Sequence, residues 1–328
     1  MTGETPTNEV IRPAAAAGPA EAPFPVGLAE RAQAFGETGY AVIDGGLFDD
    51  LPGALRRAGL FGRSLFLDHA DAEIERAGPW LVPLSRAGDA PERIFRLVGD
   101  RPAVVIWSCA AGEPALYRHL RSLNLVRIPA WAAAGGSTPP EDGAEAPDET
   151  VMFRHWDPRV LGALMPVLDA GQFARIVGPA SEVAYWAEDY GGLKRVIADP
   201  DWPVAGGGLL TVRAEQIALL GDRRVDASRQ RIMSFLRDTA PEHASHRSDG
   251  ELYQDVVRYE ASAREVGLTS ERSFGKWAHL MAMSGEAIAV KDGPAHRYLT
   301  TAPGRPDDKL ETLIAEMIAV ARHAERGA

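Results

Sequence analysis

Cysteine is almost absent from this sequence, which has a single example, Cys109, in 328 residues. One cysteine cannot close an intramolecular disulfide or supply a cysteine-rich zinc site, so neither is expected to stabilise the fold. This usage is typical of a protein that stays in a reducing compartment. Because Cys109 follows an apolar run, we expect it to be a small buried side chain.

Long hydrophobic runs and an excess of positive charge are also lacking. No stretch approaches eighteen consecutive apolar residues, and residues 1–27 do not show the basic and apolar regions of a signal peptide. The 35 Lys and Arg residues against 46 Asp and Glu residues give a formal net charge of −11, which disfavours a nucleic-acid partner. The sequence therefore predicts a cytoplasmic protein with no nucleic-acid and no membrane partner.

From Tyr40 onward the chain alternates short apolar runs with helical patterns, which predicts α/β structure. The expected strands are 40–43, 64–67, 80–84, 103–107, 125–128, 151–156, 182–187 and 193–197. Between the first five of these strands, the expected helices are 51–60, 91–98 and 114–123. The continuous apolar run 103–107 is expected to be a central strand buried on both faces.

Composition divides the chain into three parts. Residues 1–35 predict a disordered tail that is rich in proline and alanine, and residues 36–205 predict an α/β domain. Within that domain, 132–150 has five acidic residues and no basic ones, which indicates a flexible insertion. Residues 209–328 predict a helical lobe. The fold class is thus α+β or α/β, with an N-terminal mixed-sheet lobe followed by an all-helical C-terminal lobe.

Apolar residues recur every three or four positions along the predicted helical lobe. Three such stripes are Leu252, Val256, Tyr259 and Ala263; Phe274, Trp277, Met281 and Ile288; and Leu310, Leu313, Ile314, Met317 and Ala321. We expect these stripes to pack on one another and on the first lobe. The alternative is a face kept for another protein.

Motifs for nucleotide or metal chemistry are missing. The sequence has no Walker A motif and no G-x-G-x-x-G after a strand, and the three adjacent glycines 206–208 are better explained as a hinge. The closest pair of histidines, His243 and His246, has no carboxylate arranged nearby. We therefore expect neither a cofactor nor a bound metal.

The densest group of reactive side chains lies at 153–159. If 151–156 is a strand, Arg154 and Trp156 face the side opposite to His155, so the group cannot converge on one point. Asp157 is expected to cap a helix that begins at Pro158, with Arg154 and Arg159 bracing the turn by ion pairs. A structural role is therefore favoured over catalysis.

A catalytic alternative remains open. Cys109 follows a predicted core strand and His119 lies in the next helix, so a hydrolase or transferase could use these two residues or the 154–159 segment. A passive structural subunit is a third alternative. An enzyme predicts turnover that one substitution abolishes, whereas a structural subunit predicts self-assembly.

The order of several motifs resembles that of the type VI secretion effector chaperones, an adaptor family first catalogued as a domain of unknown function. These motifs are Y-A-V-I-D-G-G at 40–46, S-L-F at 64–66, G-P-W-L-V-P-L at 78–84, L-Y-R-H-L-R at 116–121 and F-R-H-W-D-P-R-V-L at 153–161. The resemblance covers about 40–197, and the last motif, here called the signature, is the most specific. Its residues with expected structural roles are Phe153, Arg154, Trp156, Asp157, Pro158 and Arg159.

The resemblance implies a bacterial cytoplasmic adaptor without catalytic residues. Such an adaptor holds one toxic effector and delivers it to the valine-glycine repeat spike protein of the secretion machine. A carrier needs an interaction surface, and aromatic residues are enriched where protein interfaces bind most strongly. The candidate partner-binding residues near the predicted lobe boundary are Tyr185, Trp186, Tyr190 and Trp202.

Overall fold

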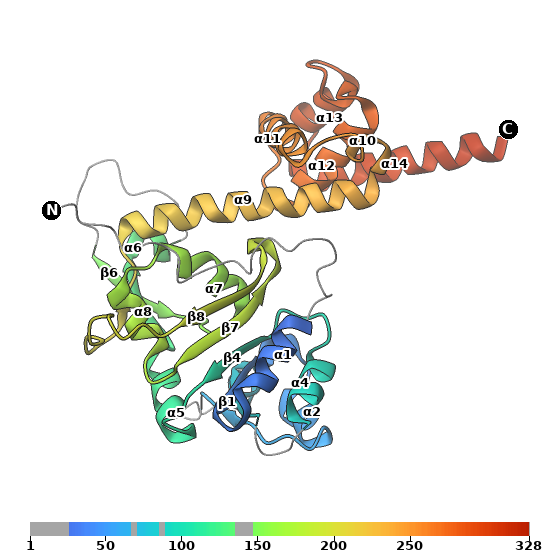
Figure 1. Cartoon of the computed structure of the whole chain (residues 1–328). Helices are drawn as coiled ribbons and strands as arrows, with labels where there is room; N and C mark the ends of the chain where they lie inside the picture. Colours follow the sequence, from blue (N-terminus) through green and yellow to red (C-terminus); the bar gives the residue numbers. More distant parts are fainter. Residues whose placement is uncertain (1–25, 67–70, 85–88, 135–146, 328) are drawn as a thin grey trace. The chain divides into compact units, whose positions relative to one another are not determined.

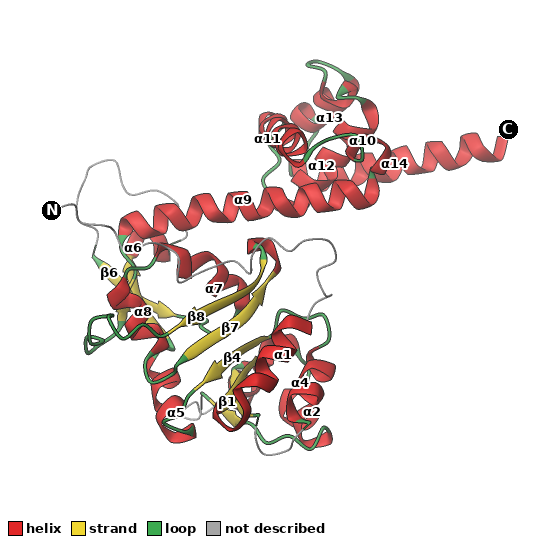
Figure 2. Ribbon diagram, viewed as in Figure 1, coloured by secondary structure: helices red, strands yellow, loops and turns green. Residues whose placement is uncertain are grey.

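The computed structural model describes residues 26–66, 71–84, 89–134 and 147–327 (Figure 1). They form two compact units, and the first ends at Arg223. The first unit carries the described strands and the second is helical, which confirms the predicted fold class (Figure 2). The division falls within helix α9 (Ala214–Thr239), later than the predicted 205–209, because strand β9 (Leu210–Thr211) still pairs inside the first unit.

A six-stranded sheet forms the centre of the first unit. Its order is β2 (Arg63–Ser64), β3 (Pro79–Pro83), β1 (Gly39–Asp44), β4 (Val104–Ser108), β7 (Glu182–Ala187) and β8 (Gly192–Ile197). Each neighbouring pair is antiparallel. Every residue of β4 is buried, which confirms the predicted central strand. The expected strand 64–67 is only the two-residue β2, and Leu67 lies outside the described residues.

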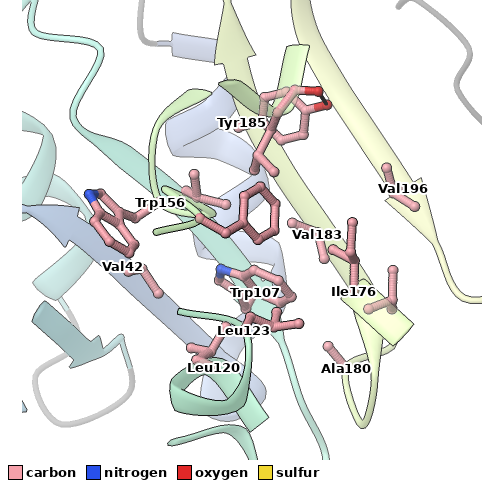
Figure 3. Close-up of a cluster of buried hydrophobic side chains, with 14 of the residues drawn as sticks. Val42, Trp107, Leu120, Leu123, Trp156, Ile176, Ala180, Val183, Tyr185 and Val196 are labelled. Atoms are coloured by element: carbon pink, nitrogen blue, oxygen red, sulfur yellow. Dashed lines mark hydrogen bonds between the residues drawn. The ribbon is translucent and has the colours of Figure 1, made fainter. Parts of the chain in front are cut away.

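Alternating residues of the sheet enter two separate cores. On one face, Val42, Trp107 and Tyr185 belong to a cluster that includes residues of α5 (Glu113–Ser122), α7 (Pro158–Leu164) and α8 (Ala170–Val177), part of which Figure 3 shows. On the other face, Ile43 and Ile106 belong to a cluster with α1 (Val26–Phe35), α2 (Leu51–Arg57) and α4 (Ala90–Val98). Because both faces are covered, the central strands β1 and β4 are buried at every residue and are largely apolar.

Helix α1 spans Val26–Phe35, so the predicted disordered tail is wrong for these residues. Leu28 and Ala32 are fully buried, and Arg31 forms an ion pair with Glu182 of β7. This tertiary burial orders a segment whose composition alone does not suggest a helix. Residues 1–25 of the predicted tail, and 135–146 of the predicted acidic insertion, lie outside the described residues.

A second, three-stranded sheet has the order β6 (Asp148–Met152), β5 (Leu125–Pro129) and β9. The β5 and β9 strands are parallel, so mixed pairing occurs in this small sheet and not in the large one. The predicted strand 151–156 is wrong beyond Met152. The amide of Phe153 donates to the carbonyl of Asn124, and the chain then turns, so that Phe153 and Trp156 both enter the same core.

Short helices complete the first unit: α3 (Ala72–Ala77), α6 (Ala130–Ala133), and the single turns η2 (Gly36–Thr38), η3 (Gly45–Leu47), η4 (Met165–Val167) and η5 (Glu188–Tyr190). The second unit contains the rest of α9 with α10 (Pro241–Ala244), α11 (Asp249–Glu265), α12 (Glu271–Ser284), η6 (Ala287–Ala289), α13 (Pro294–Thr301) and α14 (Pro306–Gly327).

The helical stripes form the core of this second unit. The Leu252 stripe is buried on α11, and Phe274, Trp277 and Met281 are buried on α12, which confirms that these stripes are core. The third stripe is buried at Leu310 but reaches the surface on α14, where Met317 is 41% exposed. The packing prediction is therefore wrong for Met317, and the side chain of Ala321 lies outside the described ones.

Candidate functional site

The signature residues form a tight turn followed by the first turn of α7. The Asp157 carboxylate accepts a hydrogen bond from the Arg159 amide at 2.9 Å, and Pro158 occupies the first helical position. The predicted N-cap is thus confirmed. Proline suits this position because its missing N–H would have no partner inside the helix.

Two buried carboxylates hold two arginines around this turn. The Arg154 guanidinium lies 2.6 Å from a carboxylate oxygen of Asp44 and 3.4 Å from Asp157, while Arg159 lies 3.1 Å from Asp157. The ion pairs confirm that both arginines brace the turn. The strand on which we based the divergence of this group is wrong, because the segment is a turn, but His155 still lies apart from the ion pairs, buried against Asn124.

Sequence reasoning missed Asp44, which lies 110 residues before Arg154 in the chain. Its carboxylate also accepts from the Gly46 amide at 3.0 Å, so it caps the turn η3 at the end of β1. The available signal was an aspartate followed by two glycines directly after a strand. Each carboxylate therefore has a backbone donor and a cationic partner.

The exposed part of this network consists of guanidinium groups. The side chains of Arg154 and Arg159 are 44% and 48% exposed, whereas those of Asp44 and Asp157 are buried. The hydrogen bond to Asp157 raises the pKa of Arg159, so its charge is permanent. A guanidinium that cannot titrate is suited to binding carboxylates, not to acid-base catalysis.

His155 lies inside the signature but is fully buried. Its Nε2 is 3.1 Å from the Asn124 side-chain oxygen, and its ring packs edge-on against Trp156. Burial lowers the pKa of His155 to about 3, so the ring is neutral at physiological pH. Its role in this position is packing, since its Nδ1 has no hydrogen-bond partner among the described residues.

The buried neutral state of His155 predicts a specific loss of stability in acid. The pKa is about 3 when folded and about 6.5 when unfolded, so below pH 6.5 the unfolded chain binds a proton that the folded chain excludes. Stability is therefore present above pH 6.5 and is lost as the pH falls towards 3, with a slope that approaches about 1.4 kcal/mol per pH unit.

Urea unfolding between pH 7 and 4.5 tests this with a His155→Gln variant. We expect its free energy of unfolding to depend less steeply on pH than that of the wild type, by up to about 1.4 kcal/mol per unit. His246 is exposed, so His246→Gln is the matched control and should keep the wild-type slope. Parallel curves for the wild type and His155→Gln would contradict the buried neutral histidine.

The candidate pair Cys109 and His119 makes separate contacts with one backbone segment. The Cys109 thiol donates to the Pro179 carbonyl at 3.4 Å, and the His119 Nε2 lies 2.7 Å from the Ile176 carbonyl. Burial raises the pKa of the thiol and lowers the pKa of the imidazole. A nucleophilic cysteine needs the opposite shift of its thiol. Cys109 is buried, as expected from the sequence.

The four candidate aromatic residues do not form one surface. Tyr185 is fully buried, with its hydroxyl donating to the Leu161 carbonyl at 3.3 Å, so it offers no contact to a partner. Trp186 points to the opposite face of the sheet, against Gly192. Trp202 stacks on Phe173 at a ring distance of 5.5 Å. Three of the four therefore have clear packing roles inside the first unit.

Tyr190, the fourth aromatic residue, lies beside the signature helix. A Cβ atom on Gly162 of α7 would come within 2.6 Å of the Tyr190 ring, so only glycine permits this close contact. The guanidinium of Arg223 lies 5.6 Å from the ring centroid, within the range of a cation-π contact. Tyr190 is half-buried, so part of it remains at the surface.

The glycines predicted as a hinge line a cleft of about 640 Å³ together with His119, Arg121, Leu125 and Arg175. Arg175 forms hydrogen bonds within the wall of the cleft, because it donates to the carbonyls of Gly208 at 3.1 Å and Ser122 at 2.9 Å.

Within the described part of the chain, no three His, Cys, Asp or Glu side chains gather as a metal site would require. None of the helices in that part is both long and apolar enough to cross a bilayer.

Comparison with known proteins identifies a family model that matches part of the chain. Residues 39–175 match the model of a family described as a domain of unknown function (DUF4123). This segment runs from β1 into α8 and therefore includes Asp44 and the whole signature. Neither the curated proteins nor the solved structures gave a match.

Proposed function

We propose that the protein is an adaptor that binds a type VI secretion effector and loads it onto the valine-glycine repeat spike protein. The observation that carries the proposal is the match over 39–175, which covers the motifs whose order resembles the effector chaperones. In the same segment, Arg154 and Arg159 are fixed by buried carboxylates with their guanidinium groups partly exposed. Rigid, partly exposed arginines are common anchors of protein interfaces.

The catalytic alternative has less support. The thiol of Cys109 is buried and its pKa is raised, and His155 is buried and neutral. The carboxylates of Asp44 and Asp157 are each occupied by a backbone amide and an arginine. A general base needs a free lone pair within reach of substrate, and these groups do not offer one.

Affinity capture of the tagged protein from its own secretion-active cells tests the proposal. We expect an effector and the spike protein to remain bound at near-integer ratios, as identified by mass spectrometry. The neutral variant Arg159→Gln should retain at least tenfold less of one partner, because buried or fixed charged contacts at interfaces are worth about 2–5 kcal/mol. Its thermal midpoint is measured alongside.

Arg96→Gln is the matched control, since Arg96 is exposed on α4 and loses the same charge. It should retain both partners at the wild-type level. Recovery of the wild-type protein alone would argue against the adaptor function. If Arg159→Gln and Arg96→Gln retain equal amounts of both partners, Arg159 of the signature does not contribute to the proposed interface.

A further inference from the structure

Lys194 of β8 is a buried lysine that has no acidic partner among the described residues. The residue is only 6% exposed, and within that part of the chain its Nζ makes one hydrogen-bond contact, to the Gly191 carbonyl at 3.5 Å. That distance is at the limit of a hydrogen bond. Burial lowers the pKa of Lys194, which reflects the poor solvation of its charge.

A second cation, Arg223, lies in the same region. Its terminal nitrogen contacts the Gly162 carbonyl at 3.5 Å, and its Nε is buried with no hydrogen-bond partner among the described residues. The Arg223 charge further lowers the pKa of Lys194, so the two cations repel one another. The central carbon of the guanidinium lies 5.6 Å from the centroid of the Tyr190 ring.

The other buried charges of the first unit are paired. Glu182 forms ion pairs with Arg31 and Arg195, and the two buried carboxylates of the signature network bind Arg154 and Arg159. Within the described residues, neither Lys194 nor Arg223 lies within ion-pair distance of a carboxylate. An unpaired charge at a poorly solvated site costs stability, so an anion bound beside these two cations would stabilise them.

We propose that Lys194 and Arg223 form a receptor for a carboxylate on an acidic side chain of the cargo effector. This inference rests on the proposed adaptor function. Arg223 is partly exposed and its guanidinium lies 5.6 Å from the centroid of the Tyr190 ring, so it can offer a charged N–H donor to a carboxylate beside that ring. Lys194 supplies a second charged donor near the start of β8, and the Tyr190 ring supplies an apolar wall.

The structural alternative is that Lys194 and Arg223 only cap backbone carbonyls, those of Gly191 and Gly162. Cations are favoured near the C-terminal end of a helix such as α7. The two explanations predict opposite effects of Lys194→Met. If Lys194 caps carbonyls, its loss destabilises the fold. If it is held unpaired for a ligand, a buried apolar side chain of similar length raises the thermal midpoint, by about 2–4 °C for a unit of this size.

Binding is measured first with a defined probe, the peptide hexaglutamate, with hexaglutamine as the uncharged comparison. We expect the wild type to bind hexaglutamate in isothermal titration calorimetry, and Lys194→Met and Arg223→Met to bind it at least tenfold more weakly. Arg224→Met is the matched control, because Arg224 is exposed and carries the same charge one residue later. It should bind the peptide as the wild type does.

The same variants are then used in effector capture from cells. Loss of the effector from Lys194→Met, with a raised thermal midpoint and full capture by Arg224→Met, supports the receptor. A lowered midpoint, or equal binding of hexaglutamate by Lys194→Met and the wild type, overturns it. If the wild type binds the peptide through Lys194 but captures no effector, the adaptor function fails while a carboxylate site remains. If Lys194→Met and the wild type capture the effector equally, the adaptor function stands and only the proposed carboxylate receptor is overturned.

Discussion

A Gly45→Ala variant is expected to lose about 3 kcal/mol of unfolding free energy in the first unit. A Cβ atom at this position would lie 2.1 Å from the Arg76 carbonyl oxygen and 2.5 Å from that of Gly78. Both obstacles are backbone atoms and cannot rotate away, so the chain itself must move. That movement also disturbs the hydrogen bond from the Gly45 amide to the Gly78 carbonyl, now 2.9 Å long.

The effect of Gly45→Ala extends to the signature network, since Gly45 directly follows Asp44. Moving the end of β1 displaces the carboxylate that holds Arg154 at 2.6 Å. We therefore expect weaker capture of partners as well as lower stability. This joint effect connects the Y-A-V-I-D-G-G motif to the signature, although 110 residues separate Asp44 from Arg154.

The buried Cys109 provides a selective measurement for the first unit. Its thiol is protected while the unit is folded, so labelling by a thiol reagent across a urea series reports unfolding there. Gly45→Ala should be labelled at lower urea than the wild type. Gly207→Ala is the control, because a Cβ there meets no atom within 4 Å. Identical labelling of both variants would contradict the steric argument.

Local patterns in the sequence were sufficient for most strands of the large sheet, though not for their pairing, and for the α7 cap. The expected strand 182–187 matches β7, and Asp157 with Pro158 begins α7, because in both cases neighbouring residues determine the structure. The turn at 153–157 was mistaken for a strand because its apolar residues suit either conformation. The conformation is decided by a distant group, the Asn124 carbonyl, which accepts a hydrogen bond from the Phe153 amide.

Contacts between distant residues explain the other errors. Helix α1 is ordered by burial of Leu28 and by the pairing of Arg31 with Glu182, 151 residues away, neither of which composition reveals. The candidate aromatic residues were chosen as one group, yet Tyr185 and Trp186 point to opposite faces of β7. The approach of Lys194 to Arg223 likewise required the folded chain.

A Trp277→Ala variant is expected to lose about 3–5 kcal/mol of unfolding free energy in the second unit. Trp277 is fully buried at the centre of the helical core, so its removal leaves a large cavity. Its indole N–H also donates to the Ser262 hydroxyl of α11 at 2.7 Å. The substitution thus removes both packing and a hydrogen bond between α11 and α12.

Circular dichroism in urea measures this loss, because the second unit is helical and its unfolding removes a large part of the signal. Met283→Ala is the control, since Met283 is 61% exposed on the same helix and should change stability by less than about 0.5 kcal/mol. Cys109 labelling in Trp277→Ala should keep its wild-type urea dependence, because the thiol belongs to the other compact unit. A parallel shift of both signals would instead mean that the two units unfold as one, and that a defect in the helical core also destabilises the signature network.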